Sequence, residues 1–214
     1  TLWLKRHDRT GAADWYRVYQ RNIEDYHQFD DIDRIASSSY PAGSFESLLY
    51  EKNWIDTVQW HMEDLIRLPQ IEPTEGIKIK RRIDKSNQDR TDMVEIIDDY
   101  FLEQFKSVTS KPGARINSET PAWLLDRMSI LMLKIHHMQE QVRRTDARPE
   151  HASKCESKLA VLLEQKTDMQ LAFDEMMEDI GNGNRRFKVY RQMKMYNDPS
   201  LNPMLYKSKG KPKN

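Results

Sequence analysis

The stretch IKRRIDKSNQDRTDMVEIIDDYF, residues 79–101, decides the fold because it carries a helical hydrophobic stripe with a polar interruption. Apolar side chains recur at three- and four-residue steps on both sides of the interruption, at Ile79, Ile83, Val94, Ile97 and Phe101. Between them, the same helix face carries Asn87 and Arg90. A hydrophobic helix face that turns polar for about two turns indicates either a buried polar layer or a binding site.

The overall composition is typical of a helical protein without a membrane span. The 214-residue chain is 38% hydrophobic and 32% charged, and it contains only 7 glycines, which favours an all-α fold. The longest apolar run, near residues 130–133, is far too short to cross a membrane. The single cysteine, Cys155, cannot form an internal disulfide, which agrees with a reducing compartment. We therefore expect a soluble, cytoplasmic protein.

Hydrophobic periodicity predicts five long helices, over residues 12–28, 44–68, 74–106, 121–142 and 150–180. Ser44 and Thr120 are typical N-cap residues, and Gly181 is typical of the residue that ends a helix. The short turn centred near Ile71 favours antiparallel packing of the second and third helices. The predicted fold is therefore an all-α bundle of about five long antiparallel helices, with no strands and with an irregular basic C-terminal arm.

Charge divides the chain into two unequal parts. Residues 181–214 hold nine basic residues against one acid, Asp198, which gives this segment a charge of +8. Because the whole chain is neutral, residues 1–180 carry −8. An acidic body attracts a basic tail, and such a tail also suits an anionic partner.

The domain organisation follows from this charge pattern. We divide the chain into a helical bundle domain, residues 1–181, and a basic arm, residues 182–214. We expect one short helix in the arm, over residues 186–195, and disorder in the last residues. Docking of residues 187–206 on the acidic bundle is the favoured interpretation, and RNA binding by the basic and aromatic side chains of the arm is the alternative.

Four stretches of the chain together resemble a known family. They are NWIDTVQWHMEDLIR (53–67), KRRIDKSNQDRTDMVEIIDDYF (80–101), INSETPAWLLDRMSILMLKIHHM (116–138) and KVYRQMKMYNDPSLNP (188–203). They are similar to the bacterial family catalogued as domain of unknown function 4254, which is common in Bacteroidota, and the resemblance covers most of residues 40–205. It implies a soluble, all-helical bacterial protein and an association with glycosyltransferase gene neighbourhoods. It implies no reaction.

Polar side chains on the second, third and fourth predicted helices form a candidate ligand-binding layer. In an antiparallel hairpin centred near Ile71, residues equally far from the turn lie level, which places Asn53 near Arg90. An antiparallel fourth helix brings Lys134 level with Glu95. The candidate residues are Asn53, Trp60, Glu63, Arg67, Asp84, Asn87, Arg90, Glu95, Lys134 and His137.

Three hypotheses about function stay open, and none involves a membrane. In the first, an anionic metabolite such as a nucleotide sugar binds to Arg90, Lys134 and Arg127, and Glu95 or His137 moves a proton. In the second, the layer is an internal salt-bridge network that sets helix register in a non-enzymatic protein-interaction or scaffold module. In the third, the basic tail binds nucleic acid in an RNA- or ribosome-associated factor. The sequence indicates no reaction, so enzymatic activity is left open.

Metal binding has little support in the sequence. Carboxylates at helical steps would suit a hard cation, namely Asp84, Glu95 and Asp98. His136 and His137 are adjacent and point in different directions on a helix, which makes them poor joint ligands. His61 and Asp64 are three residues apart, and we interpret them as a surface pair. We therefore assign no metal ligands and expect no cofactor.

Overall fold

The computed structural model describes residues 11–193, 195 and 198–208, and its fold is all-α. Its elements are α2 (Ala12–Tyr26), α3 (Phe45–Leu65), α4 (Pro73–Phe105), β1 (Arg115–Ile116), α5 (Pro121–Arg143), α6 (Pro149–Gly181), β2 (Arg185–Arg186) and α7 (Pro203–Ser208). The five long helices are those that the hydrophobic periodicity predicts, with ends shifted by a few residues. None of the helices among the described residues is both long and apolar enough to cross a membrane.

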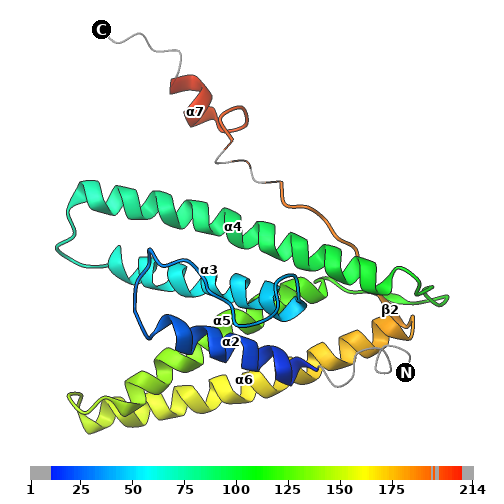
Figure 1. The fold of residues 1–214 in the computed structure, drawn as a ribbon, viewed down its shortest axis with the longest axis horizontal. Helices are drawn as coiled ribbons and strands as arrows, with labels where there is room; N and C mark the ends of the chain where they lie inside the picture. Colours follow the sequence, from blue (N-terminus) through cyan, green and yellow to red (C-terminus); the bar gives the residue numbers. More distant parts are fainter. Residues whose placement is uncertain (1–10, 194, 196–197, 209–214) are drawn as a thin grey trace.

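The long helices form two hairpins with α2 packed against both. Figure 1 shows α3 beside α4, and α5 beside α6, each pair joined by a short connection. The α2 helix contacts α3, α5 and α6, so its apolar face becomes the centre of the core. The Tyr19 hydroxyl donates to the Leu125 carbonyl at 3.2 Å, and the Trp15 and Phe45 rings meet edge to face at 5.1 Å. These contacts hold α2 against α5 and α3.

The helix starts follow the local sequence signals. The Ser44 hydroxyl accepts a hydrogen bond from Ser47 N at 3.1 Å, and the Thr120 hydroxyl accepts one from Trp123 N at 3.3 Å. Each bond satisfies a backbone donor that the first helical turn leaves without a partner. Both predicted N-caps are therefore confirmed, and Pro121 occupies the first turn of its helix as expected.

The C-terminal arm differs from its prediction. The described residues of 186–195 contain no helix, so the predicted short helix is wrong. Instead, Arg185 and Arg186 pair in parallel with Arg115 and Ile116, which makes a two-stranded sheet that the sequence did not predict. A backbone engaged in this ladder cannot also form helical i to i−4 bonds. The helix of the arm is α7, further along the chain, which Figure 1 shows extending away from the bundle.

The first part of the arm does contact the bundle. Phe187 packs against the core beside Phe105, with ring centroids 6.5 Å apart. The Arg191 guanidinium binds the α4 carboxylates of Glu95, at 3.5 Å, and Asp99, at 2.5 Å. Basic arm and acidic body thus meet along α4. The expected disorder at the Lys-rich end concerns mainly residues 209–214, which lie outside the described residues.

Candidate functional site

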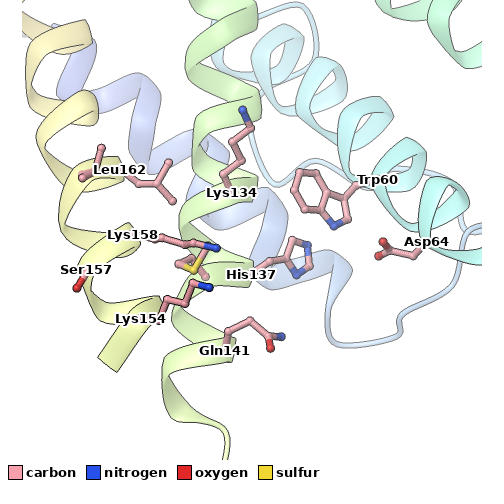
Figure 2. A pocket seen from close by; sticks show the side chains of 11 residues that line it. Trp60, Asp64, Lys134, His137, Gln141, Lys154, Ser157, Lys158 and Leu162 are labelled. Atoms are coloured by element: carbon pink, nitrogen blue, oxygen red, sulfur yellow. The ribbon is translucent and has the colours of Figure 1, made fainter. Parts of the chain in front are cut away.

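A groove of about 810 Å³, here called the Trp60 groove, is lined by residues of α3, α5 and α6 (Figure 2). Trp60 and Asp64 line it from α3, and Lys134 and His137 line it from α5. The other lining residues, from α5 and α6, are Met138, Gln141, Lys154, Ser157, Lys158, Val161 and Leu162. Three of the predicted candidate residues, Trp60, Lys134 and His137, therefore share one cavity.

Two ring systems fix one wall of the Trp60 groove. The His137 imidazole stacks on the Trp60 indole, with centroids 4.9 Å apart and planes 11° from parallel. His137 Nδ1 lies 2.7 Å from Glu140 Oε2, which holds the imidazole from its other side. Because both contacts restrict the same ring, the aromatic wall of the groove is rigid before any ligand arrives.

Cationic side chains line the groove without counterions. Its three ammonium groups have no ion-pair or hydrogen-bond partner among the residues that the structure describes, and they belong to Lys134, Lys154 and Lys158. Several lysines elsewhere on the surface are paired, and Lys85, for example, binds Asp89 at 2.8 Å, one helical turn away. Because Asp64 is the one acid among the described residues that line it, the groove combines apolar walls with an excess of positive charge.

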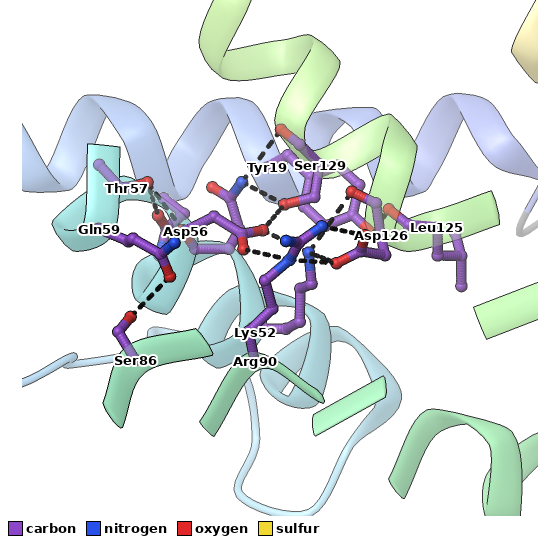
Figure 3. A network of polar contacts seen from close by, with 12 residues as sticks. Tyr19, Lys52, Asp56, Thr57, Gln59, Ser86, Arg90, Leu125, Asp126 and Ser129 are labelled. Atoms are coloured by element: carbon purple, nitrogen blue, oxygen red, sulfur yellow. Dashed lines mark hydrogen bonds and ion pairs between the residues drawn. The ribbon is translucent and has the colours of Figure 1, made fainter. Parts of the chain in front are cut away.

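A second polar cluster lies inside the bundle, where the polar interruption of α4 faces α3 and α5 (Figure 3). We call Lys52, Asp56, Arg90 and Asp126 the ionic network. Lys52 Nζ lies 2.6 Å from Asp126 Oδ1 and also pairs with Asp56. Arg90 Nε lies 2.8 Å from Asp126 Oδ1 and 3.5 Å from Asp56 Oδ1, and Arg90 Nη2 binds the other oxygen of Asp126. The two positive and the two negative side-chain charges of the network cancel.

The two carboxyl groups of the ionic network differ in their protonation equilibria. Burial raises the pKa of Asp56, and the charge of Asp126 adds to this effect, against the opposing influence of Lys52. Burial also raises the pKa of Asp126, but Lys52 and Arg90 outweigh it and leave that pKa below its ordinary value. Asp56 is therefore the carboxyl group that accepts a proton first.

Neutral side chains complete the inner layer. The Asn53 amide donates to the Ser129 hydroxyl at 2.7 Å, and that hydroxyl donates to Asp56 at 2.5 Å. The Thr57 hydroxyl donates to the Asn53 backbone carbonyl at 2.8 Å, and the same oxygen lies 3.3 Å from the Asn22 amide oxygen. The candidate Asn53 is therefore a fully buried member of a hydrogen-bonded chain, remote from solvent.

Arg90 connects the ionic network with the surface. Its side chain is 31% exposed, whereas Asp56 and Lys52 expose none of theirs. A pocket of about 370 Å³ opens above it, lined also by Trp60, Glu63 and Arg67. Glu63 and Arg67 pair with each other at 2.6 Å, so the cation on the rim of this smaller pocket is neutralised.

The remaining candidates lie apart from these two clusters. Asp84 pairs with Lys80 on its own helix, and Asn87 accepts a hydrogen bond from the Gln59 amide at 2.9 Å. Glu95 pairs with Arg191 of the arm instead of Lys134. Arg127, expected beside Arg90, binds Glu119 at 3.0 Å. The three acidic residues considered for a hard cation therefore do not form one site. Asp84 and Glu95 already have cationic partners, and Asp98 is buried next to Thr120.

Several important residues escaped the sequence analysis. One is Lys52, which lies four residues before Asp56, a spacing that indicates an ion pair on a helix. Asp126 and Ser129 lie on the face of α5 that also carries the buried Leu125, and polar residues at such positions signal buried partners. No local pattern marks Lys154 and Lys158, which only the packing of α6 beside α5 brings to the groove.

A family model described as "Protein of unknown function (DUF4254)" matches residues 46–189, more than half of the chain. The chain belongs to the DUF4254 family. No curated protein and no solved structure matches it.

The DUF4254 match contains both clusters described above. It covers α4, α5 and α6 completely and all but the first residue of α3, so the Trp60 groove and the ionic network both lie inside it. The α2 helix and α7 lie outside. Because the family description carries no activity, the function of this DUF4254 protein has to be argued from the geometry of the groove and the network.

Proposed function

We propose that this DUF4254 protein binds an anionic small molecule in the Trp60 groove. The observation that carries the proposal is the set of unpaired lysines on its walls, Lys134, Lys154 and Lys158. Unpaired ammonium groups that converge on a cavity attract phosphate or carboxylate groups, since each contact is a charge-assisted hydrogen bond. The groove volume of about 810 Å³ is within the range of small-molecule sites.

The apolar part of the lining narrows the class of ligand. Trp60, Met138 and Leu162 lie beside the lysines, so the cavity suits a molecule with both an anionic group and a ring or apolar moiety. Nucleotides and nucleotide sugars have this combination, with a flat base for the indole side and phosphates for the ammonium groups. Inorganic phosphate has only the second feature and is expected to bind more weakly.

We assign the ionic network a structural role in this proposal. Arg90, expected to bind the anion, already donates to Asp126 through Nε and Nη2, and Lys52 lies between two carboxylates. An incoming anion would have to displace Asp126 from both cations and bury a further negative charge. The lysines of the Trp60 groove impose no such cost, since they have no carboxylate to release.

A thermal-shift screen with isothermal titration calorimetry tests the proposal. The ligands are UDP, ADP, UDP-glucose and pyrophosphate, with uridine and adenosine as uncharged controls. The expected result is a rise in melting temperature with at least one anionic ligand, lost in the Lys134→Gln/Lys158→Gln double variant. The matched control is Lys78→Gln/Lys106→Gln, which removes the same charge from exposed positions on α4. The proposal is wrong if no anion shifts the parent, or if both double variants lose binding equally.

A further inference from the structure

Four of the six histidines of the chain form one cluster beside the Trp60 groove. His27 follows the end of α2, His61 lies on α3, and His136 and His137 lie on α5. His27 stacks on His136 at 4.4 Å, and His61 lies 5.1 Å from His27 and 5.3 Å from His137, measured between ring centroids. Rings from three separate helices thus converge on one point.

One ring nitrogen of each histidine in this cluster lacks a hydrogen-bond partner among the described residues. The Nε2 atoms of all four histidines are buried, and no hydrogen-bond partner for any of them occurs among the described residues. An imidazole nitrogen buried without a partner costs free energy, and such atoms are rare in folded proteins. His136 Nε2 has a carboxylate neighbour, Glu140 Oε1 at 3.6 Å. The other three Nε2 atoms require an explanation, because ring packing alone provides no hydrogen-bond partner.

Carboxylates hold the opposite nitrogens. His27 Nδ1 lies 2.7 Å from Asp30 Oδ1, and His137 Nδ1 lies 2.7 Å from Glu140 Oε2. In metal sites, a ligating histidine typically donates its other ring N–H to a carboxylate, which fixes the tautomer and makes the free nitrogen more basic. These bonds leave Nε2 as the free ligand atom of both rings.

The geometry points to a transition-metal site, and we propose that His27, His61 and His137 bind Zn²⁺. One ligand nitrogen from each lies within 4.8 Å of the other two, a spacing that a small contraction converts to tetrahedral coordination. Three imidazoles favour zinc and similar divalent metals over magnesium or calcium, which prefer oxygen ligands. Three protein ligands also leave a fourth position for water or a substrate, as in catalytic zinc sites.

A neighbouring set, His136, His137 and Glu140, is less suitable. The His136 and His137 rings are adjacent on one helix and stand 88° apart, and Glu140 is already engaged with His137 Nδ1. In the favoured set, the three ligands come from three helices, and no ligand has to give up a partner. His136 then packs on His27 as an outer contact.

The surroundings suit a cation. A pocket of about 380 Å³ reaches His61 and is lined also by Asp30, Asp31 and Asp64, so a positive ion has an acidic entry route. This inference is independent of the anion proposal, although His137 borders the Trp60 groove.

Titration of the chelator-treated full chain with Zn²⁺, and with Co²⁺ as a spectroscopic probe, tests the site. One zinc ion per chain should bind, and Co²⁺ should give the intense visible absorption of tetrahedral coordination. The variants His61→Ala and His137→Ala should each lose more affinity than the roughly 10–100-fold typical of outer-shell changes. His151→Ala removes a histidine outside the cluster and should bind zinc normally.

Two results would overturn the metal site. One is the absence of zinc binding, or an octahedral Co²⁺ spectrum, in the unaltered chain, a result that does not depend on whether variants fold. The other is zinc binding that survives in the His27→Ala/His61→Ala/His137→Ala triple variant. The Lys134→Gln/Lys158→Gln variant should retain zinc, so failure of the anion proposal and failure of the metal site are distinguishable.

Discussion

Lys52 Nζ lies 2.6 Å from Asp126 Oδ1, and neither side chain exposes more than 2% of its surface. A lysine on α3 and an aspartate on α5 are thus joined where no water screens them. Removing one member of a buried ion pair costs about 3–5 kcal/mol, since it leaves the partner charge without compensation. We therefore expect Lys52→Met to lower the free energy of unfolding by about 3–5 kcal/mol, measured by urea denaturation.

The matched comparison for Lys52→Met is the double variant Lys52→Met/Asp56→Asn. It removes one positive and one negative charge together and leaves Arg90 paired with Asp126. The double variant should be more stable than Lys52→Met alone, because the net charge of the cluster returns to zero. If the two substitutions instead destabilise additively, the charges are not a balanced network.

Anion affinity should depend on unpaired cations and not on cations in general. Lys158→Gln removes an unpaired ammonium group from the Trp60 groove, and we expect affinity to fall about ten-fold or more, the value of one charged hydrogen bond. Arg67→Ala removes a cation paired with Glu63 in the adjacent pocket and should change affinity by less than about two-fold. Calorimetric titration compares the anion affinities of the two variants. If Arg67→Ala weakens binding more than Lys158→Gln does, the anion binds at the smaller pocket.

Zinc affinity should depend on Glu140 although it is not a proposed ligand. Its carboxylate holds His137 Nδ1 at 2.7 Å and thereby fixes the ring. We expect Glu140→Gln to weaken zinc binding about 10–100-fold without changing the stoichiometry. A competition titration with a chromophoric chelator measures this, and the exposed Glu103→Gln is the control of equal charge change. Equal affinities of Glu140→Gln and the parent would show that Glu140 does not orient a ligand.

Asp98 should make stability depend on pH in an unusual direction. Burial raises its pKa to about 6, with Glu95 and Asp99 also raising it, while a hydrogen bond with Thr120 and the charge of Arg191 oppose the shift. Because the folded state binds this proton more tightly than the unfolded chain does, the contribution is fully present below about pH 4 and is lost as pH rises through 6.

The variant Asp98→Asn isolates this effect. Compared with the parent, its relative stability should rise by up to about 3 kcal/mol between pH 4 and 7. Subtracting the two unfolding curves cancels the contributions of other groups, including His61, whose lowered pKa gives the opposite slope. The exposed Asp92→Asn, on the same helix, serves as the control, because Asp92 is not among the groups that shift the pKa of Asp98. A difference that is independent of pH would show that Asp98 titrates normally.

Substitution of Gly183 by alanine should destabilise the protein, whereas the same substitution of Gly76 should not. Its φ is +72°, and a Cβ there would lie 2.6 Å from the Thr109 carbonyl oxygen. Gly183→Ala should therefore cost more than about 1 kcal/mol of unfolding free energy. Gly76→Ala, inside α4 with its nearest contact at 3.9 Å, should instead stabilise by about 0.4–1 kcal/mol. Thermal unfolding measures both, and equal effects would contradict the close approach.

The interrupted hydrophobic stripe of α4 shows which features of the polar layer the local sequence pattern predicts. Ile83, Val94 and Ile97 are buried as their spacing predicts, and Arg90 in the interruption does take part in a buried polar layer. The spacing did not reveal its partner. Asp126 lies 36 residues away on α5. The sequence pattern of α4 does not show which acidic residue of α5 faces Arg90.

The C-terminal arm shows a second limit of prediction from the local sequence. Its basic and aromatic composition predicted docking of residues 187–206 on the acidic bundle. Phe187 and Arg191 make such contacts, whereas α7 extends away from the bundle (Figure 1). Its helix prediction was wrong: Arg186, at the start of the predicted helix, pairs with Ile116, seventy residues earlier, and Gln192 N donates to Glu95 Oε1 at 3.0 Å. Long-range backbone pairing overrides weak local helix propensity.

The sequence by itself determined the helices, their caps and their apolar faces, because these depend on interactions between residues three or four positions apart. Only the tertiary structure decided which side chains meet: Lys52 with Asp126, the unpaired lysines around Trp60, and His27 and His61 with His137. Those contacts depend on how the helices rotate and slide against one another, and that arrangement is set by side-chain packing over the whole bundle.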